Sequence, residues 1–526
     1  MFNKFLPLIV FLIVLPVMLI KISSLNIWEY DDGISLLAAT GHQSEYHENP
    51  PTNKLTKAEE WKKLWHIEDK FCFNEIKQGL ISHDIHPPLY FWLLHLWILI
   101  WGQPDLIMGP VLNIILFLFA LFALNSLCRK FKLKTSTRLF THLFWISSSA
   151  VLVPLHQIRQ YVLLTLITIL FHNAVIAFLN NKNLKNQAFV ISITALGLLT
   201  HYHFFLIAFS AILFVLASQR YDHSTKLIFF KDLALTGLFF ILVNPFFYQS
   251  FLNQQGQWEV ITIVSLKTRT FITVKSFLNF FFPSSVAKSI GLFVSFHYKF
   301  FFFLVLLIIA AILFLLYLRL KADKKISFKV SYLLFNIIFI SSVVIILYLS
   351  NKTPYHAIRS KYLCHLYPLF SLFLGVLLQK YLSKKILVVT VSILVVYQLV
   401  SSSFEVKLFI DRKQVERKYN YKVDESALFL IDDYNRGILP RAFYHFSPEQ
   451  KVFVSDQNTI ISRFDSIIDD FGDNFVYMSE CTWKTNSVEK RQAILTKFEK
   501  RDYYVTDTKK SIYGLYRIYS VSKKNE

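Results

Sequence analysis

Apolar runs long enough to cross a membrane recur along most of the chain, and they limit the possible folds more than any other feature. A transmembrane helix needs about 20 mainly apolar residues. The first run, 5–22, is followed by no small-residue cleavage site, so we expect it to be retained. Ten more runs lie at 109–128, 139–155, 161–179, 188–200, 204–217, 233–251, 298–318, 330–349, 362–378 and 386–402. With 54% hydrophobic residues and a mean hydropathy of +0.43, the chain would expose too much apolar surface as a soluble protein. The sequence therefore predicts an α-helical polytopic membrane protein with about 11 transmembrane helices.

The basic residues between these runs predict the orientation. The formal net charge of +21 would suit a nucleic-acid partner, but the lysines and arginines lie mainly in short loops between apolar runs. Short cytoplasmic loops are enriched in these residues. With a cytoplasmic N-terminus, the basic loops all fall on the cytoplasmic side if the aromatic helix expected at 89–100 lies on the membrane surface. We expect this orientation in the cytoplasmic (inner) membrane, and no nucleic-acid partner.

The orientation divides the chain into two domains. Residues 1–403 would form the transmembrane domain, with a long outer loop at 26–88 and outer juxtamembrane helices. Residues 404–526 would form a small extracytoplasmic α/β domain, because short apolar strands at 427–432, 451–456 and 474–478 alternate with helical patterns at 460–471 and 488–501.

Two acidic groups stand in the outer loop. Asp31 and Asp32 follow the first apolar run, and Asp84 precedes His86 by two residues. The two prolines after His86 favour an extended approach to a helix start. Asp84 and His86 should thus point to the same side, at a membrane rim where ionisable groups are costly unless they function. The pair could bind a divalent metal ion, or His86 could hold a phosphate, while a capping role for Asp84 is about equally reasonable.

Further candidates fall at the outer ends of later spans. They are Arg159, Tyr161, Arg359 and Lys361. Cationic side chains can pair with phosphate oxygens, and the alternative is contact with lipid headgroups. His201 and His203 flank Tyr202 in an outer turn, where interfacial anchoring is the simpler interpretation.

The order of these motifs resembles a known family. An acidic pair after the first span, then Asp-x-His-Pro-Pro-Leu at 84–89 opening an aromatic helix that ends in Trp101-Gly102, is similar to the GT-C type membrane glycosyltransferases. More narrowly it resembles the protein O-mannosyltransferase and aminoarabinose transferase superfamily, glycosyltransferase family 39. The segments 156–164 and 359–368 look like two later motifs of these enzymes. The resemblance covers roughly the first 400 residues and does not extend to the C-terminal domain.

The resemblance implies a fold, a donor and roles for residues. It implies a GT-C fold, a sugar donor on a polyprenyl phosphate, and a lipid, glycan or protein acceptor. Asp31 matches the catalytic base and Asp32 stands where relatives commonly have glutamate. Asp84 and His86 fall beside the donor phosphate or a divalent metal ion that some members use. Substrate contacts would also come from Asp32, Arg159, Tyr161, Arg359 and Lys361. An arginine common after the Trp-Gly position is missing, and Lys361 interrupts the usual Arg-Tyr pair.

The chemistry of glycosyl transfer fits these residue types. A carboxylate accepts the proton of the attacking hydroxyl group, and cations stabilise the departing phosphate. The alternative is a transporter or lipid flippase of envelope glycolipids. Such a protein would carry ionisable residues near the bilayer midplane in two related halves, whereas here they gather at one face and no repeated half is visible. A transferase fold without activity is a third possibility, which the presence of Asp31 disfavours.

Overall fold

The computed structural model describes residues 2–526 apart from 85, 147, 246, 250–264, 279–287, 289–327, 350–359, 382, 419, 433–438, 481–487, 513 and 525–526. These residues form two compact units. The first consists of residues 1–22, 84–90 and 110–407, and the second of residues 23–83, 91–109 and 408–526.

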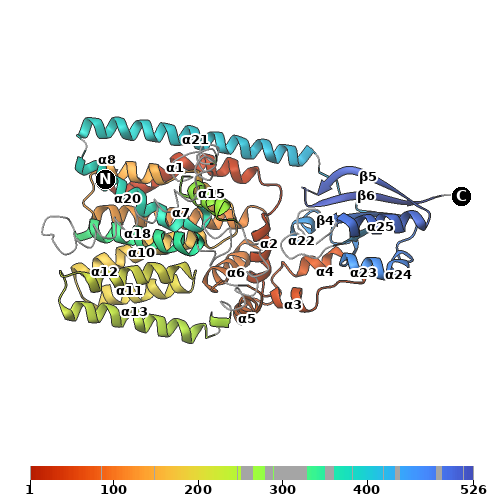
Figure 1. The fold of residues 1–526 in the computed structure, drawn as a ribbon, viewed down its shortest axis with the longest axis horizontal. Helices are drawn as coiled ribbons and strands as arrows, with labels where there is room; N and C mark the ends of the chain where they lie inside the picture. Colours follow the sequence, from red (N-terminus) through yellow and green to blue (C-terminus); the bar gives the residue numbers. More distant parts are fainter. Residues whose placement is uncertain are drawn as a thin grey trace. The chain divides into compact units, whose positions relative to one another are not determined.

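The first unit is built from helices (Figure 1). Its described helices are α1 (Phe2–Ser23), α7 (Met108–Lys130), α8 (Thr135–Ile146), α9 (Ser149–Leu155), α10 (Tyr161–Asn180), α11 (Leu184–Leu198), α12 (His203–Ala217), α13 (His223–Val243), α15 (Leu266–Leu278), α18 (Phe328–Leu349), α19 (Ser360–Leu363), the 3-10 helix η1 (Cys364–Leu366), α20 (Tyr367–Tyr381) and α21 (Lys384–Lys418). Among the described residues, five helices are long and apolar enough to cross a membrane, and three apolar helices are shorter. The predicted polytopic helical architecture is confirmed, while the count of 11 spans stays a prediction.

Several helix bounds differ from the apolar runs. The run 139–155 is divided between α8 and α9, and Ser148 is the N-cap residue of α9. Helix α13 begins at His223, well before the apolar run that starts at residue 233. Its first turns are therefore formed by polar residues of the expected basic loop. Helix α21 continues for 35 residues, well past the apolar run 386–402 (Figure 1). Its last residues, 408–418, belong to the second unit. The run 298–318 lies outside the described residues.

Several polar side chains inside the apolar helices bond to nearby groups, which lowers the cost of placing them in lipid. On α10, Thr165 and Thr168 each donate a hydrogen bond to the carbonyl oxygen four residues earlier, both at 2.8 Å. Nδ1 of His172 lies 2.9 Å from the hydroxyl oxygen of Tyr332 on α18. Asn173 donates to the carbonyl oxygen of Ala123 on α7 at 2.9 Å. These bonds join α10 to two neighbouring helices.

Short helices make up most of the outer loop in the second unit. They are α2 (Tyr30–Ala39), α3 (Gln43–Glu48), α4 (Ala58–Lys63), α5 (Phe73–His83) and α6 (Leu89–Trp101), of which α6 begins in the first unit. Helix α6 starts directly after the two prolines, as the sequence predicts. Its 13 residues span about 20 Å, which is short for a bilayer crossing.

The C-terminal domain is α/β, as predicted, and contains a mixed six-stranded sheet. The strand order is β1-β3-β2-β4-β6-β5, with β1 (Leu55–Lys57), β2 (Phe429–Ile431), β3 (Lys451–Val454), β4 (Asn474–Glu480), β5 (Tyr503–Ile512) and β6 (Tyr516–Lys523). Strands β3, β2 and β4 are parallel, and the other pairings are antiparallel. The helices of this domain are α22 (Leu439–Phe443), α23 (Gln457–Ser462), α24 (Phe464–Ile468) and α25 (Val488–Lys500).

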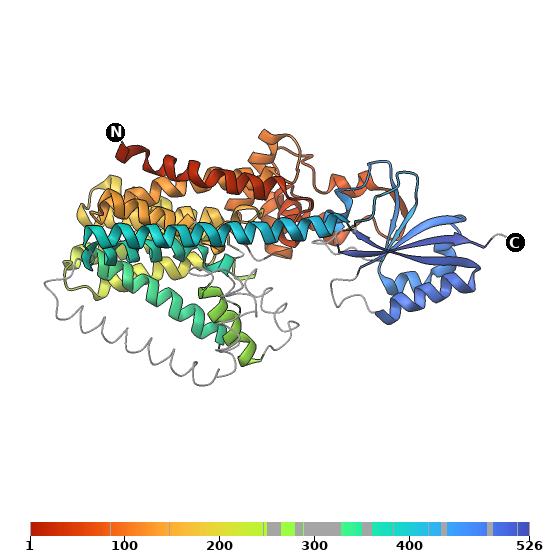
Figure 2. The ribbon, with the colours of Figure 1, turned by 90° about the horizontal axis from the view of Figure 1, so that it is seen from above.

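One face of the sheet carries the main core of this domain. Strand residues such as Phe453 and Tyr477 pack with Ile460, Phe464 and Phe498 of the helices. Figure 2 shows α25 along this face. The expected helix at 460–471 is divided at Arg463, between α23 and α24.

The outer loop contributes the edge strand β1 to this sheet. Thr56 pairs with Val452 across nearly 400 residues of sequence, and the backbone N–H of Asn53 donates to the Val454 carbonyl oxygen at 2.9 Å. The Asn53 side chain accepts a bond of 2.6 Å from the Ser455 hydroxyl group. The loop and the C-terminal domain therefore fold as one unit.

Candidate active site

The two acidic residues after the first helix lie in the first turn of α2. Negative charge is favoured there because the helix dipole is positive at this end. The carboxylate of Asp32 accepts a hydrogen bond from the Glu29 backbone N–H at 2.9 Å, and its side chain is buried. Asp31 is only half-buried. The two carboxylates thus differ in their surroundings: Asp32 caps its own helix, and Asp31 is the more exposed.

The segment before Asp31 is held by contacts of Trp28. The indole N–H of Trp28 donates to the Asp105 carbonyl oxygen at 3.2 Å, and its ring lies 4.9 Å from that of Tyr444. The Arg441 guanidinium group donates to the Trp28 carbonyl oxygen. Arg441 and Tyr444 belong to α22 and the turn after it. The C-terminal domain therefore contacts the chain only a few residues before Asp31.

Asp84 and His86 form a close pair in the first unit. Nδ1 of His86 lies 2.6 Å from Oδ1 of Asp84, and both side chains are largely buried. A carboxylate that accepts from one ring nitrogen fixes the ring orientation and directs the other nitrogen away from itself. The predicted same-side placement therefore leads to a direct hydrogen bond, in which Asp84 orients His86.

Aromatic and cationic side chains from three further turns lie beside this pair. The His86 ring is 5.8 Å from the His201 ring, which is 6.1 Å from the Tyr161 ring. Nζ of Lys361 lies 5.8 Å from the centre of the Tyr161 ring. The Tyr362 ring packs against Tyr161 edge to face at 5.2 Å. We call the group the outer cluster, and its members are His86, Arg159, Tyr161, His201, His203, Lys361, Tyr362 and His365.

The histidines of the outer cluster lie close together. The ring centres of His201 and His203 are 4.7 Å apart, and those of His203 and His365 are 5.8 Å apart. The His203 backbone N–H donates to Nδ1 of His201 at 3.0 Å. Nδ1 of His201 is therefore an acceptor, and the neutral ring carries its proton on Nε2. This proton makes His201 a hydrogen-bond donor within the cluster.

Burial lowers the pKa of His201 well below its ordinary value, and the nearby histidines and Arg159 lower it further. The ring is 8% exposed, so the interpretation of His201 as an interfacial anchor is wrong. Its surroundings are mainly cationic or neutral donors, which repel a further positive charge and would attract an anion. The outer cluster is thus electrostatically suited to a phosphate group.

The structure brings five of the predicted residues into this arrangement: Asp84, His86, Arg159, Tyr161 and Lys361. Asp31 and Asp32 belong to the second unit. Arg359 lies outside the described residues. Sequence patterns gave no functional role to His201, His203 or His365, although the pair of histidines in one outer turn was a usable signal.

A metal ion would need more ligands than the predicted pair provides. Within the described part of the chain, no group of three or more His, Cys, Asp or Glu side chains is arranged to hold a metal ion. Because Asp84 is bonded to the His86 ring, the pair fits an oriented imidazole better than two ligands on one ion. Any metal bound there would take most of its ligands from water or substrate.

The fold can be compared with those of known proteins. No family model matches the sequence, and no curated protein matches it. The crystal structure of ArnT from Cupriavidus metallidurans bound to undecaprenyl phosphate matches with a TM-score of 0.53 at 9% identity, over 98% of this chain and 97% of that chain. The Archaeoglobus fulgidus oligosaccharyltransferase in complex with Zn and sulfate gives a TM-score of 0.45 at 11% identity, over 89% of this chain and 68% of that chain. From the likeness to ArnT, together with the helical first unit and the α/β domain, we conclude that this protein has the fold of a GT-C type membrane glycosyltransferase.

Proposed function

We propose that the protein is a glycosyltransferase that moves a sugar from a polyprenyl-phosphate donor to a lipid, glycan or protein acceptor of the cell envelope. The observation that carries this proposal is the outer cluster, in which Arg159, Lys361 and His201 gather beside the pair of Asp84 and His86. The cluster occurs in a fold shared with ArnT, whose structure holds undecaprenyl phosphate. A polyprenyl phosphate has the negative charge that such a cluster attracts and the apolar tail that membrane helices accommodate.

The reaction we propose is an inverting displacement. The acceptor hydroxyl oxygen attacks the anomeric carbon while the Asp31 carboxylate takes the hydroxyl proton. The bond between the anomeric carbon and the phosphate oxygen breaks, and the electron pair leaves with the polyprenyl phosphate. Asp31 suits the role of base because it is half-exposed, whereas Asp32 is buried and bonded to the Glu29 backbone.

The outer cluster would stabilise the leaving group. The Arg159 guanidinium group offers paired donors to phosphate oxygens, and the Lys361 ammonium group adds a point charge. The His201 Nε2–H is a further donor, held in its tautomer by the His203 backbone. Removal of one donor that stabilises charge in the transition state often lowers kcat by roughly 100-fold or more.

A divalent metal ion remains part of the proposal only as an addition to the cluster. His86 would supply one ligand while Asp84 holds its ring. The ion would supply further positive charge to the phosphate when bound. Chelation of metal from the purified protein, followed by transfer assays with and without added Mg²⁺, Mn²⁺ or Zn²⁺, tests this addition separately.

The location follows from the same considerations. We propose a multi-pass protein of the cytoplasmic membrane with a cytoplasmic N-terminus, and with the catalytic residues and C-terminal domain on the outer side. The basic loops support this orientation. Labelling of single cysteines, introduced at Lys182 in a basic loop and at Glu449 in the C-terminal domain, by an impermeant reagent on intact cells tests it: we expect only the second to react.

The function is tested by transfer of radiolabelled sugar from a panel of polyprenyl-phosphate donors in membranes. The comparison is between wild type, Asp31→Asn and Asp32→Asn at equal protein level. Asp32→Asn is the matched control, because an amide oxygen can still accept the Glu29 backbone N–H. We expect transfer by wild type and the control, and loss of transfer in Asp31→Asn. No transfer with any donor would reject the proposal in favour of a transporter or flippase.

A further inference from the structure

His95 is a fully buried histidine on α6 that the reaction above does not use. Both of its ring nitrogens face backbone carbonyl oxygens. Nδ1 lies 2.9 Å from the carbonyl oxygen of Ala39, the last residue of α2, and Nε2 lies 3.0 Å from the carbonyl oxygen of Lys70. A carbonyl oxygen only accepts hydrogen bonds, and a neutral imidazole has one N–H. The ring donates through the nitrogen that carries its proton, and it lies between the end of α2 and the 70–73 segment.

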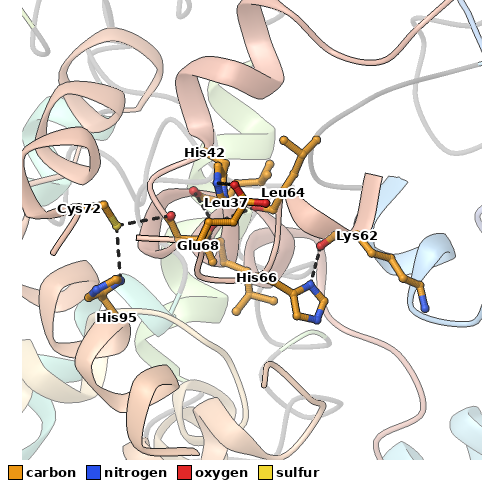
Figure 3. Close-up of polar contacts among 10 residues, drawn as sticks. Leu37, His42, Lys62, Leu64, His66, Glu68, Cys72 and His95 are labelled. Atoms are coloured by element: carbon orange, nitrogen blue, oxygen red, sulfur yellow. Dashed lines mark hydrogen bonds and ion pairs between the residues drawn. The ribbon is translucent and has the colours of Figure 1, made fainter. Parts of the chain in front are cut away.

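The neighbouring cysteine also contacts the ring. Sγ of Cys72 lies 3.7 Å from Nδ1 of His95 (Figure 3). The same sulfur atom lies 3.5 Å from the Thr40 carbonyl oxygen. Burial raises the pKa of the Cys72 thiol to about 11, so the thiol keeps its proton and donates to Thr40. The thiol therefore leaves Nδ1 of His95 to the Ala39 carbonyl oxygen.

The groups around His95 come from α2, from the start of α5 and from the residues just before α5. The Ala39 carbonyl lies at the C-terminal end of α2, where the helix dipole is negative. Asp69 and Glu75 lie near enough to raise the pKa of Cys72 by their charge. The other side chain packed on the ring is Phe73, edge on at 5.3 Å. Lys70 contributes its backbone oxygen to the ring.

These contacts connect His95 to the helix that carries Asp31. Helix α2 has ten residues and is about 15 Å long, with Asp31 in its first turn and Ala39 at its end. Asp32 fixes the first end by its bond to Glu29, and His95 and Thr40 fix the second. The Thr40 hydroxyl group also donates to the Leu64 carbonyl oxygen at 2.8 Å. Of these tethers, His95 is the one that reaches α2 from α6.

We propose that His95 is the positioning residue of Asp31, and that its ring joins the end of α2 to α6 and to the 70–73 segment. This inference rests on the proposed function for the role of Asp31. His95 touches no substrate in this account, and it acts by holding α2, and with it the carboxylate, in one place.

The test compares His95→Gln with Trp92→Phe, a matched control on the same face of α6. The Trp92 indole N–H donates to the Phe73 carbonyl oxygen at 3.0 Å, so it tethers α6 to the same 70–73 segment but not to α2. Glutamine can reach only one of the two carbonyl groups. We expect His95→Gln to lower kcat by roughly tenfold or more, with KM for the donor near wild type, because a small misplacement of a catalytic group is costly. Trp92→Phe should lower thermal stability and leave kcat near wild type.

A second readout uses chemical rescue. If glutamine prevents folding, His95→Gly with added imidazole replaces it, and recovery of kcat with imidazole is expected. A wild-type kcat in His95→Gln, an equal kcat loss in Trp92→Phe or no recovery with imidazole would each overturn the proposal. If wild type transfers sugar and Asp31→Asn does not, any of these results rejects the positioning role alone. Absence of transfer by wild type rejects the proposed function instead.

Discussion

Gly197 on α11 is a position where one added methyl group should disturb the outer cluster. A Cβ atom at Gly197 would overlap the ring of Phe204. Phe204 is fully buried in the second position of α12, and its ring packs edge to face on Phe171 at 5.3 Å. The ring therefore has no open space to enter, so Gly197→Ala must move α12, which begins at His203.

The cost can be worked from these contacts. Overpacking of a buried site typically costs about 1–3 kcal/mol. Replacement of glycine by alanine inside a helix stabilises the helix by about 1 kcal/mol. We therefore expect Gly197→Ala to lower the free energy of unfolding by up to about 2 kcal/mol. Because His201 and His203 stand directly before Phe204, donor binding should weaken as well.

The matched control is Gly237→Ala on α13, since no atom lies within 4 Å of a Cβ built there. The measurements are thermal unfolding of the purified protein in detergent and KM for the donor. Gly237→Ala should be as stable as wild type or up to about 1 kcal/mol more stable, with unchanged KM. Equal stability and KM in Gly197→Ala and wild type would refute the packing argument.

Three further predictions concern the second unit. Burial raises the pKa of Cys72 to about 11, so this thiol should resist alkylation near neutral pH in the folded protein and react only after denaturation. Mass spectrometry measures the alkylation, and rapid modification of the native protein would contradict the prediction. Arg441→Ala removes the donor to the Trp28 carbonyl oxygen, so kcat should fall while KM for the donor is kept, and Arg463→Ala in the same domain should leave both unchanged. Asp432 is fully buried and accepts hydrogen bonds from Gln457, Tyr477, Ser479 and the Glu480 backbone. Asp432→Ala should therefore lower the free energy of unfolding by about 3 kcal/mol, as measured by thermal denaturation. Asp470→Ala, at an exposed position, should change it hardly at all.

The helical membrane architecture was predictable because apolar length and charge act locally along the sequence. The start of α6 was predictable for the same reason, since the two prolines after His86 fix the backbone there. Helix bounds such as the start of α13 at His223 were not, because a polar first turn is compatible with either a loop or a helix.

Contacts between distant segments were beyond the sequence patterns. Strand β1 is only three residues long, and its pairing with β3 depends on the whole C-terminal sheet. The antiparallel pair β5 and β6 was also missed, since its exposed residues weaken the apolar pattern.

The candidate site was predictable in part. Asp84, His86, Arg159, Tyr161 and Lys361 were singled out by residue type and by their place at helix ends, and the structure brings them together. The association of His201 and His203 with them needs the packing of α11 and α12 against α10, which one sequence does not reveal. The same holds for the contact of His95 with α2.

The central claim is that the base and the phosphate site are separate parts of one transfer reaction. The most direct measurement is donor binding and single-turnover sugar transfer, both with purified protein, in Asp31→Asn and Arg159→Gln. Lys380→Gln, at the exposed far end of α20, serves as the control for loss of charge. The account predicts that Asp31→Asn binds donor like wild type but does not transfer, and that Arg159→Gln loses donor affinity. Transfer by Asp31→Asn at the wild-type rate, or unchanged donor affinity in Arg159→Gln, would contradict it.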